Sequence, residues 1–236
     1  MDVATLLSFG PRGWGDEIAW GVVVTVTLAL ATLPLGLLVG FFIALGKQSE
    51  EKSLRLAANI YTTIFRGLPE LLTLFLVFYG AQIGIQQFVR LFSPGTTVEI
   101  NAFVAGMIAL GAVFSSFASE VLLSAFRAIP RGQYEGGYAI GLSHFQTMRL
   151  IILPQLVRIA LPGLSNLWLI LIKDTALVSV IGLSDIIRQT GVAARVTKEA
   201  FLFFGVACLL YLALAILSSV ALGAIDRWAG KEGVGR

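Results

Sequence analysis

Hydrophobic residues in this chain fall into long runs, not into the short alternating patterns of a water-soluble core. Five runs are long enough to cross a bilayer as a helix, which takes about 20 residues. They cover residues 18–45, 57–85, 102–126, 151–172 and 201–225. Arg66, Pro69 and Glu70 interrupt the second run. The pattern predicts an all-α integral membrane protein with five transmembrane helices.

The composition agrees with this prediction. A mean hydropathy of +0.87, with 57% hydrophobic and 13% charged residues, excludes an ordinary soluble domain. The one cysteine, Cys208, lies in the last run, so the chain cannot form an internal disulfide. We therefore interpret residues 1–236 as a single transmembrane domain.

The distribution of basic residues predicts how the chain is oriented. One side of the predicted membrane domain carries nine lysines and arginines and the other carries five. By the positive-inside rule, the side with nine faces the cytoplasm. This orientation places the N-terminus outside, and it places the C-terminus and the segment 127–150 in the cytoplasm. The nine are Lys47, Lys52, Arg55, Arg127, Arg131, Arg149, Arg227, Lys231 and Arg236, against Arg12, Arg90, Arg188, Arg195 and Lys198.

Ionisable residues inside the runs are the first candidates for a functional site. Each costs at least about 2.5–3.5 kcal/mol within a membrane, so it needs a partner or a polar cavity. Arg66 and Glu70 are four residues apart and would face the same way on a continuous helix. Pro69 breaks or kinks that helix. The pair therefore either presents polar groups to a substrate at a broken helix or forms a structural salt bridge near the interface.

Glu120, Lys173 and Asp174 are the other charged candidates. Glu120 follows a stretch rich in small and hydroxyl residues, 115–119. Its carboxylate either attracts a cationic substrate or anchors a helix of a partner subunit. Lys173 and Asp174 are adjacent, so they point in different directions on a helix, and one of them is expected to face a cavity.

The sequence predicts no catalytic set, no cofactor and no metal site. Serine, histidine and acid residues are not arranged as in a hydrolase, and His144 is the one histidine, so an imidazole-based metal site has no second ligand of that kind. Nucleic acid is not an expected partner either. We predict a non-catalytic membrane protein, with any ATP hydrolysis carried out by a partner chain.

A polar segment between the third and fourth runs has a distinctive spacing. Glu135-Gly136-Gly137 is followed after three residues by Gly141, and nine residues later by Ile151, one residue and Leu153-Pro154. The spacing resembles the cytoplasmic loop by which permease subunits of ATP-driven importers contact a separate ATPase. That consensus has two alanines where Gly136 and Gly137 stand. Each glycine is expected to weaken the helix by roughly 1 kcal/mol.

Further stretches resemble the polar amino acid branch of binding-protein-dependent ABC importers, and within it the Q-type permease of histidine/lysine/arginine/ornithine and octopine/nopaline systems. They are Tyr61–Glu70, Phe78-Tyr79-Gly80, Ala160–Asn166 and Lys173–Ser179. The resemblance implies a type I importer fold in a bacterial inner membrane. It also implies a second permease subunit of the M type, two cytoplasmic ATPase subunits and a periplasmic substrate-binding protein.

The resemblance also suggests roles for particular residues. Arg66 would meet a substrate carboxylate and Asp174 an amino group, while Glu70 and Glu120 would favour a cationic side chain. Glu135, Gly136, Gly137 and Gly141 would contact the ATPase. Many relatives have arginine where Leu123 stands, so no Glu120–Arg pair is expected at that spacing. The implied substrates are basic amino acids or related opines.

Two alternatives belong to other classes of protein. A self-contained secondary transporter would work without an ATPase, and the preserved spacing around Glu135 disfavours it. An integral-membrane enzyme acting on lipid phosphates would need clustered basic and histidine residues at the interface, which the sequence lacks.

Overall fold

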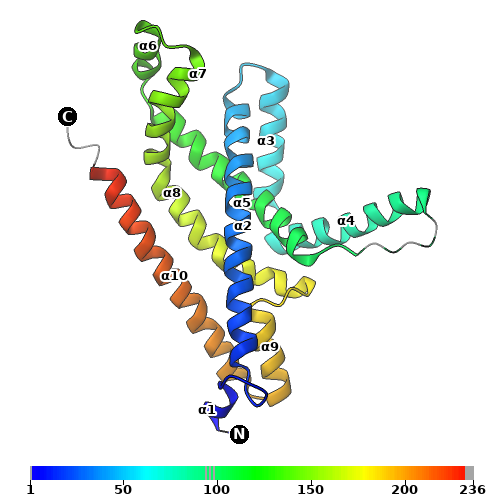
Figure 1. Ribbon diagram of the computed structural model, residues 1–236. Helices are drawn as coiled ribbons and strands as arrows, with labels where there is room; N and C mark the ends of the chain where they lie inside the picture. Colours follow the sequence, from blue (N-terminus) through cyan, green and yellow to red (C-terminus); the bar gives the residue numbers. More distant parts are fainter. Residues whose placement is uncertain (1, 94, 96, 98, 232–236) are drawn as a thin grey trace.

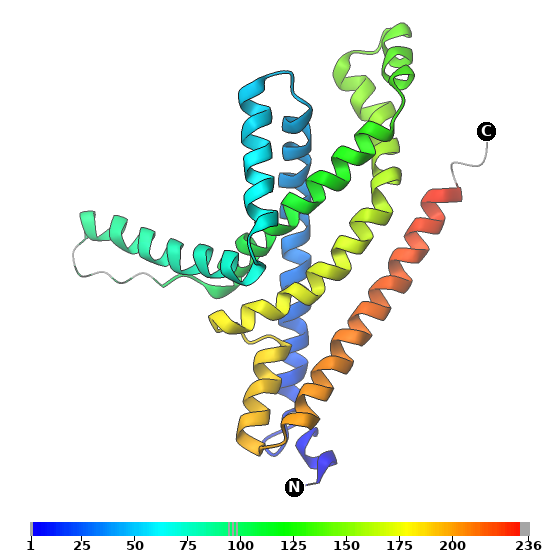
Figure 2. The same cartoon turned by 180° about the vertical axis from the view of Figure 1, so that it is seen from behind.

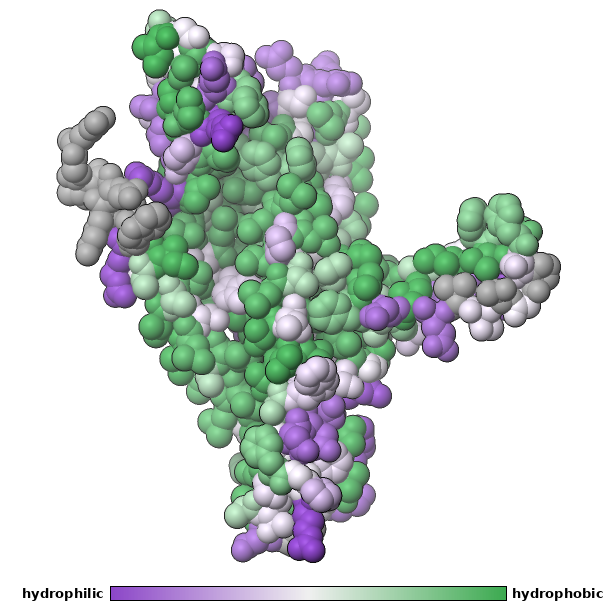
Figure 3. All heavy atoms as spheres, in the orientation of Figure 1, coloured by the Kyte–Doolittle hydropathy of each residue, from purple (hydrophilic) through white to green (hydrophobic). Residues whose placement is uncertain are grey.

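The computed structural model describes residues 2–93, 95, 97 and 99–231, and all regular secondary structure in these residues is helical. Five helical segments among them are long and apolar enough to cross a membrane, which confirms the predicted number. They are Gly15–Gln48, Glu70–Phe92, Ala102–Ala128, His144–Ile181 and Ala200–Arg227. Apolar side chains cover the middle of the molecule, and hydrophilic ones gather toward its two ends (Figure 3). Arg236, one of the residues used in the charge count, lies outside the described residues.

The N-terminal part consists of a short helix and a long hairpin. Helix α1 (Val3–Leu6) precedes α2 (Gly15–Gln48), which runs through the centre of the molecule (Figure 1). Helix α3 (Lys52–Gly67) turns back beside α2. The two helices approach closely, because a Cβ added to Gly46 would lie 3.5 Å from the Cβ of Ala58.

The second predicted span, residues 57–85, differs from the structure in its limits. It covers the end of α3 and the start of a separate helix, α4 (Glu70–Phe92). Between them Leu68 and Pro69 are extended, with ψ angles of 141° and 135°. Proline lacks a backbone N–H and disfavours helical geometry at the preceding residue, so the chain breaks here. Helix α4 therefore leaves the body of the molecule at a steep angle to α2 (Figure 1).

Helix α5 (Ala102–Ala128) is the central span. In its most apolar window 61% of the residues are buried, against 11% in α4 and in the last span. Two glycines of α2 pack directly against it: an added Cβ would lie 2.5 Å from the Phe114 ring at Gly36, and 2.9 Å from the Ser115 carbonyl oxygen at Gly40. Small residues four positions apart allow two helices to approach this closely.

The polar segment after α5 forms two short helices at one end of the molecule, α6 (Arg131–Ala139) and α7 (His144–Thr147). Helix α7 continues through a π-helical turn, Met148–Ile152, into α8 (Leu153–Asp174). Helices α5 and α8 lie side by side when the molecule is seen from behind (Figure 2). The polar segment is thus joined to the fourth span without a loop.

The remaining elements form the opposite end. A 3₁₀ segment, Thr175–Ile181, follows α8 and leads to α9 (Ile186–Thr197). Helix α10 (Ala200–Lys231) then runs back past α8. Leu6, Ile18 and Phe203 pack together with α9, so this end has its own small apolar core.

Candidate substrate site and coupling segment

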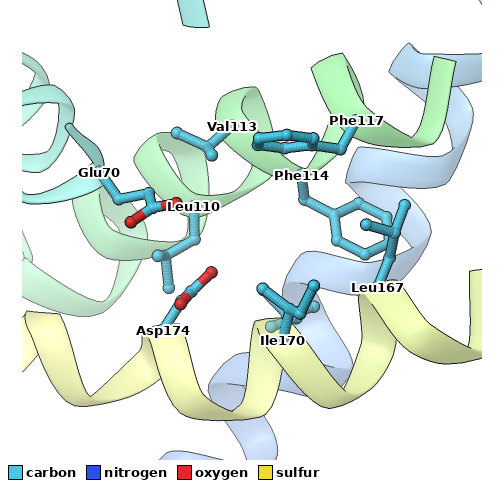
Figure 4. A pocket seen from close by; sticks show the side chains of 9 residues that line it. Glu70, Leu110, Val113, Phe114, Phe117, Leu167, Ile170 and Asp174 are labelled. Atoms are coloured by element: carbon cyan, nitrogen blue, oxygen red, sulfur yellow. The ribbon is translucent and has the colours of Figure 1, made fainter. Parts of the chain in front are cut away.

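Two of the predicted charged residues line one cavity. Glu70 begins α4 and Asp174 ends α8, and their carboxyl groups enter a cavity of about 140 Å³ from different walls (Figure 4). The other walls are apolar and come from α5 and α8, including Phe114 and Phe117. Lys173 is exposed, so of the adjacent pair it is Asp174 that faces the cavity, as one of the two was predicted to do.

Arg66 and Glu120 meet next to this cavity. A guanidinium nitrogen of Arg66 lies 3.1 Å from a carboxylate oxygen of Glu120. The guanidinium carbon also lies 5.4 Å from the centre of the Phe117 ring, which lines the cavity. A cation over an aromatic face is attracted to the ring electrons. Phe117 therefore connects the charged pair to the cavity wall.

Lys47, which the sequence analysis did not assign to the site, contacts the same oxygen of Glu120. The Lys47 side chain is 6% exposed, whereas that of Arg66 is 44% exposed. No local signal indicates this contact, because Lys47 and Glu120 lie 73 positions apart. We call Lys47, Glu120 and Arg66 the ion cluster. Formally it carries one net positive charge.

Of the two alternatives for Arg66 and Glu70, the structure does not show the salt bridge between them. The argument from a four-residue spacing holds only on a continuous helix. The break at Leu68 and Pro69 directs α4 away from α3, so Glu70 turns to the cavity while Arg66 pairs with Glu120. The prediction that Glu120 attracts a cationic substrate stays a prediction, and its carboxylate already contacts two cations of its own chain.

The arrangement separates charge within an apolar environment. Glu70 and Asp174 lie close enough for their charges to interact, and both face apolar walls. The net positive ion cluster lies beyond Phe117. Two carboxylates in low-polarity surroundings favour a cation between them. A molecule with a positive part and a carboxylate would therefore match this distribution of charge.

The residues predicted to contact an ATPase lie in and after α6. We call residues 127–150, which contain them, the coupling segment. Glu135 is exposed, and Gly141, with a φ of +83°, follows the end of α6, where a left-handed residue stops a helix. Ser143 and Gln146 then form a capping box that starts α7. The His144 ring accepts or donates a hydrogen bond of 2.8 Å with the Tyr138 hydroxyl, which ties α7 to α6.

The two glycines that replace alanine have different surroundings. A Cβ on Gly136 would meet nothing within 4 Å. A Cβ on Gly137 would lie 2.6 Å from a methyl carbon of Thr147 and 3.2 Å from Ile151. Gly137 therefore allows α6 to pack closely on the helix that leads into α8, whereas Gly136 has no such role in the described residues.

Comparison with known proteins places this geometry in a family. The family model described as binding-protein-dependent transport system inner membrane component matches residues 36–231. The chain belongs to this family. As a family member it is a multi-pass membrane protein and the permease part of a transport system. The match includes the ion cluster, both acids of the cavity and the coupling segment.

Individual members of this permease family are similar over nearly their whole length. The nopaline transport system permease protein NocQ of Agrobacterium fabrum is 38% identical over 98% of this chain and 98% of its own. The histidine/lysine/arginine/ornithine permease protein HisQ of Salmonella typhimurium is 38% identical, over 91% and 94%. A crystal structure of an amino acid ABC transporter with histidines superimposes with a TM-score of 0.76 at 31% identity, over 91% and 94% of the two chains.

Proposed function

We propose that this chain is the Q-type transmembrane subunit of an ATP-driven importer of basic amino acids or related opines in a bacterial inner membrane. The observation that carries the proposal is the cavity that Glu70 and Asp174 share, with the ion cluster beside it. Relatives named for nopaline, octopine, arginine and the histidine group support the substrate class. All of these substrates carry both a carboxylate and a basic group.

In this proposal each charged residue has a defined task. Arg66 binds the substrate carboxylate from the edge of the cavity, and Asp174 binds the amino group. Glu70, on the other wall, favours a cationic side chain. Glu120 acts mainly by positioning Arg66, because its carboxylate contacts the guanidinium group and holds it over Phe117. The apolar walls strengthen each of these contacts by excluding water.

In the proposed mechanism, the coupling segment transmits the movement of the ATPase subunits to the membrane helices. Two cytoplasmic ATPase subunits close on ATP, and each contacts the segment around Glu135 and Gly141 of one permease subunit. The movement passes through α7 into α8, so the pathway alternates between inward- and outward-facing states. A periplasmic binding protein delivers the substrate, and a second permease of the M type completes the pathway. The N-terminus is outside and the C-terminus is in the cytoplasm, following the positive-inside rule.

Uptake by reconstituted vesicles tests the proposal. The vesicles contain this chain with the permease, ATPase and binding protein encoded beside it, and they are offered radiolabelled arginine with octopine or nopaline as competitors. We expect ATP-dependent uptake that Glu135→Lys abolishes. Uptake without the ATPase, or uptake that ignores Glu135→Lys, would instead indicate a secondary transporter.

The substrate site is tested in the same vesicles. Asp174→Asn and Glu70→Gln remove one charge each from the cavity with little change in shape. The matched control is Lys173→Gln, which changes the exposed neighbour of Asp174. We expect each cavity variant to lower arginine uptake by tenfold or more, about the effect of losing 1.4 kcal/mol, and the control to retain it. Equal uptake by all three would remove these residues from the site.

A further inference from the structure

Asp185 is a fully buried carboxyl group outside the substrate cavity. It lies between the fourth and fifth spans, at the N-terminal end of α9, and has no exposed surface. One carboxylate oxygen accepts a 2.9 Å hydrogen bond from the backbone N–H of Arg188. The other oxygen is buried and has no hydrogen-bond partner among the described residues. Buried polar atoms are nearly always paired, so this oxygen requires an explanation.

Three other elements lie around this carboxyl group. Helix α2 packs against its backbone: a Cβ added to Gly21 would lie 2.9 Å from the Asp185 carbonyl oxygen. The backbone N–H of Ile186 donates to the hydroxyl of Thr25, also in α2, at 3.4 Å. Tyr211 of α10 interacts electrostatically with Asp185, and its buried hydroxyl lacks a well-formed hydrogen bond among the described residues. Thr175, from the 3₁₀ segment, lies near that hydroxyl.

The charges around Asp185 are few. Arg188, on the same helix, is the cation whose charge acts on it, and Tyr211 is the titratable group from α10. The neighbouring side chains of α2 and the 3₁₀ segment named above are threonines, which do not titrate. Burial raises the pKa of Asp185 to about 6, although the N–H groups of Arg188 and Ile187 and the Arg188 charge lower it. Desolvation outweighs these stabilising contacts.

We propose that Asp185 is a proton-binding site, and that the bound proton keeps the start of α9 packed against α2 and α10. A protonated carboxyl group leaves no charge in the buried junction between α2, the 3₁₀ segment, α9 and α10, and it gives the unpartnered oxygen a hydrogen to donate. An ionised one favours entry of water and loosening of the same contacts. Because the packed form holds the proton more tightly than a hydrated form, packing is strongest at low pH and weakens as the pH rises from about 3.8 to about 6.

The junction adjoins the substrate cavity. Thr175 directly follows Asp174, which lines that cavity, so the two sites share one turn of the chain. It also lies in the half of the molecule that bears the N-terminus, away from α6 and α7 (Figures 1 and 2). In the proposed orientation that end is outside the cell, so the junction would respond to external acidity. The proton site itself does not depend on which substrate the chain carries.

Infrared spectroscopy of the full chain in phosphatidylcholine vesicles tests the proton site directly. A protonated carboxyl group has a C=O stretching band that its carboxylate lacks. We expect the unmodified chain to show C=O absorption that Asp185→Asn lacks, and this difference between the two spectra should disappear with a midpoint near pH 6. Glu199→Gln, which changes an exposed acid in the next loop, should leave the band unchanged. A midpoint near 3.8, the ordinary value, would overturn the proposal.

A second variant and a second readout separate titration from simple loss of folding. Arg188→Gln removes the nearby positive charge, so the midpoint of the Asp185 band should move to higher pH. Amide hydrogen exchange in the first turn of α9, corrected for its intrinsic pH dependence, should rise through the same midpoint in the unmodified chain and not in Asp185→Asn. An identical rise in both proteins would show that Asp185 does not control the packing.

Discussion

The contacts of the ion cluster predict how much the substitution Glu120→Gln lowers the free energy of unfolding. The substitution keeps the shape of the side chain but removes the carboxylate that contacts both Lys47 and Arg66. The Lys47 side chain is 6% exposed, so it would be left as a nearly buried, unpaired cation. Breaking a buried ion pair by removing one partner costs about 3–5 kcal/mol. Arg66 is 44% exposed and stays hydrated, so it adds little to this cost.

The partner variant Lys47→Met should cost less. It removes the buried cation together with its need for a partner, and Glu120 keeps Arg66 at 3.1 Å. In the double variant Lys47→Met/Glu120→Gln no buried charge is left unpaired. Its cost should therefore fall below the sum of the two single costs by about 0.5–3 kcal/mol, the range for side chains in direct contact.

Unfolding by dodecyl sulfate in mixed detergent micelles, followed by tryptophan fluorescence, measures these free energies. Glu50→Gln is the control, because Glu50 is exposed in the turn between α2 and α3. We expect the control to change the free energy of unfolding by less than about 0.5 kcal/mol. The reasoning fails if Glu120→Gln costs no more than the control, or if the double variant costs the full sum of its parts.

Three further predictions concern positions where the structure shows close packing or a buried charge. Gly136→Ala should stabilise the chain by up to about 1 kcal/mol, because alanine favours a helix and its Cβ meets nothing within 4 Å. Gly137→Ala should destabilise the chain by about 1–3 kcal/mol, because its Cβ would collide with Thr147, and adding Thr147→Ala should recover part of that loss. Thermal unfolding measures all three variants. Gly21→Ala should also destabilise, by about 1–3 kcal/mol in the same assay, because its Cβ would lie 2.9 Å from a backbone oxygen of Asp185, which cannot move aside like a side-chain tip. Asp185 itself has a folded pKa near 6, above the ordinary 3.8, so the stability that its proton contributes should fall by about 3 kcal/mol in all as the pH rises between these values. In unfolding measured across that range, Asp185→Asn should lose this part of the pH dependence.

The sequence alone predicted the features that follow from the length and geometry of a single helix. Long apolar runs predicted the number of spans. Adjacent residues on a helix cannot face the same way, so one of Lys173 and Asp174 was expected to face a cavity, and Asp174 lines one in the structure. Each of these conclusions depends on local geometry alone, which the order of residues determines.

What the sequence could not supply was the direction of the chain after a break. Pro69 was recognised as a breaker, but the angle at which α4 leaves α3 follows from the extended backbone at Leu68 and Pro69, and that angle separates Arg66 from Glu70. The contact of Lys47 with Glu120 joins positions 73 residues apart, so no periodicity reveals it. The close contact of Gly137 with Thr147 was missed for the same reason, since it depends on how α6 folds back on α7.

The covalent order of the helices bears on how movement would reach the cavity. From His144 to Ile181 the chain is helical without a loop, so a displacement of α7 is carried along α8 to Asp174 at its far end. Glu70 belongs to α4. Arg66 forms an ion pair with Glu120 of α5, and α5 packs closely on α2 at Gly36 and Gly40. A push on the coupling segment would therefore move the cavity wall that bears Asp174 relative to the walls formed by α4 and α5. The π-helical turn at Met148–Ile152 is the weakest point of this connection, because its hydrogen bonding is less regular than that of an α-helix. If the π-helical turn stays rigid, the full displacement of α7 reaches Asp174. If the turn bends, the displacement is confined to the coupling segment.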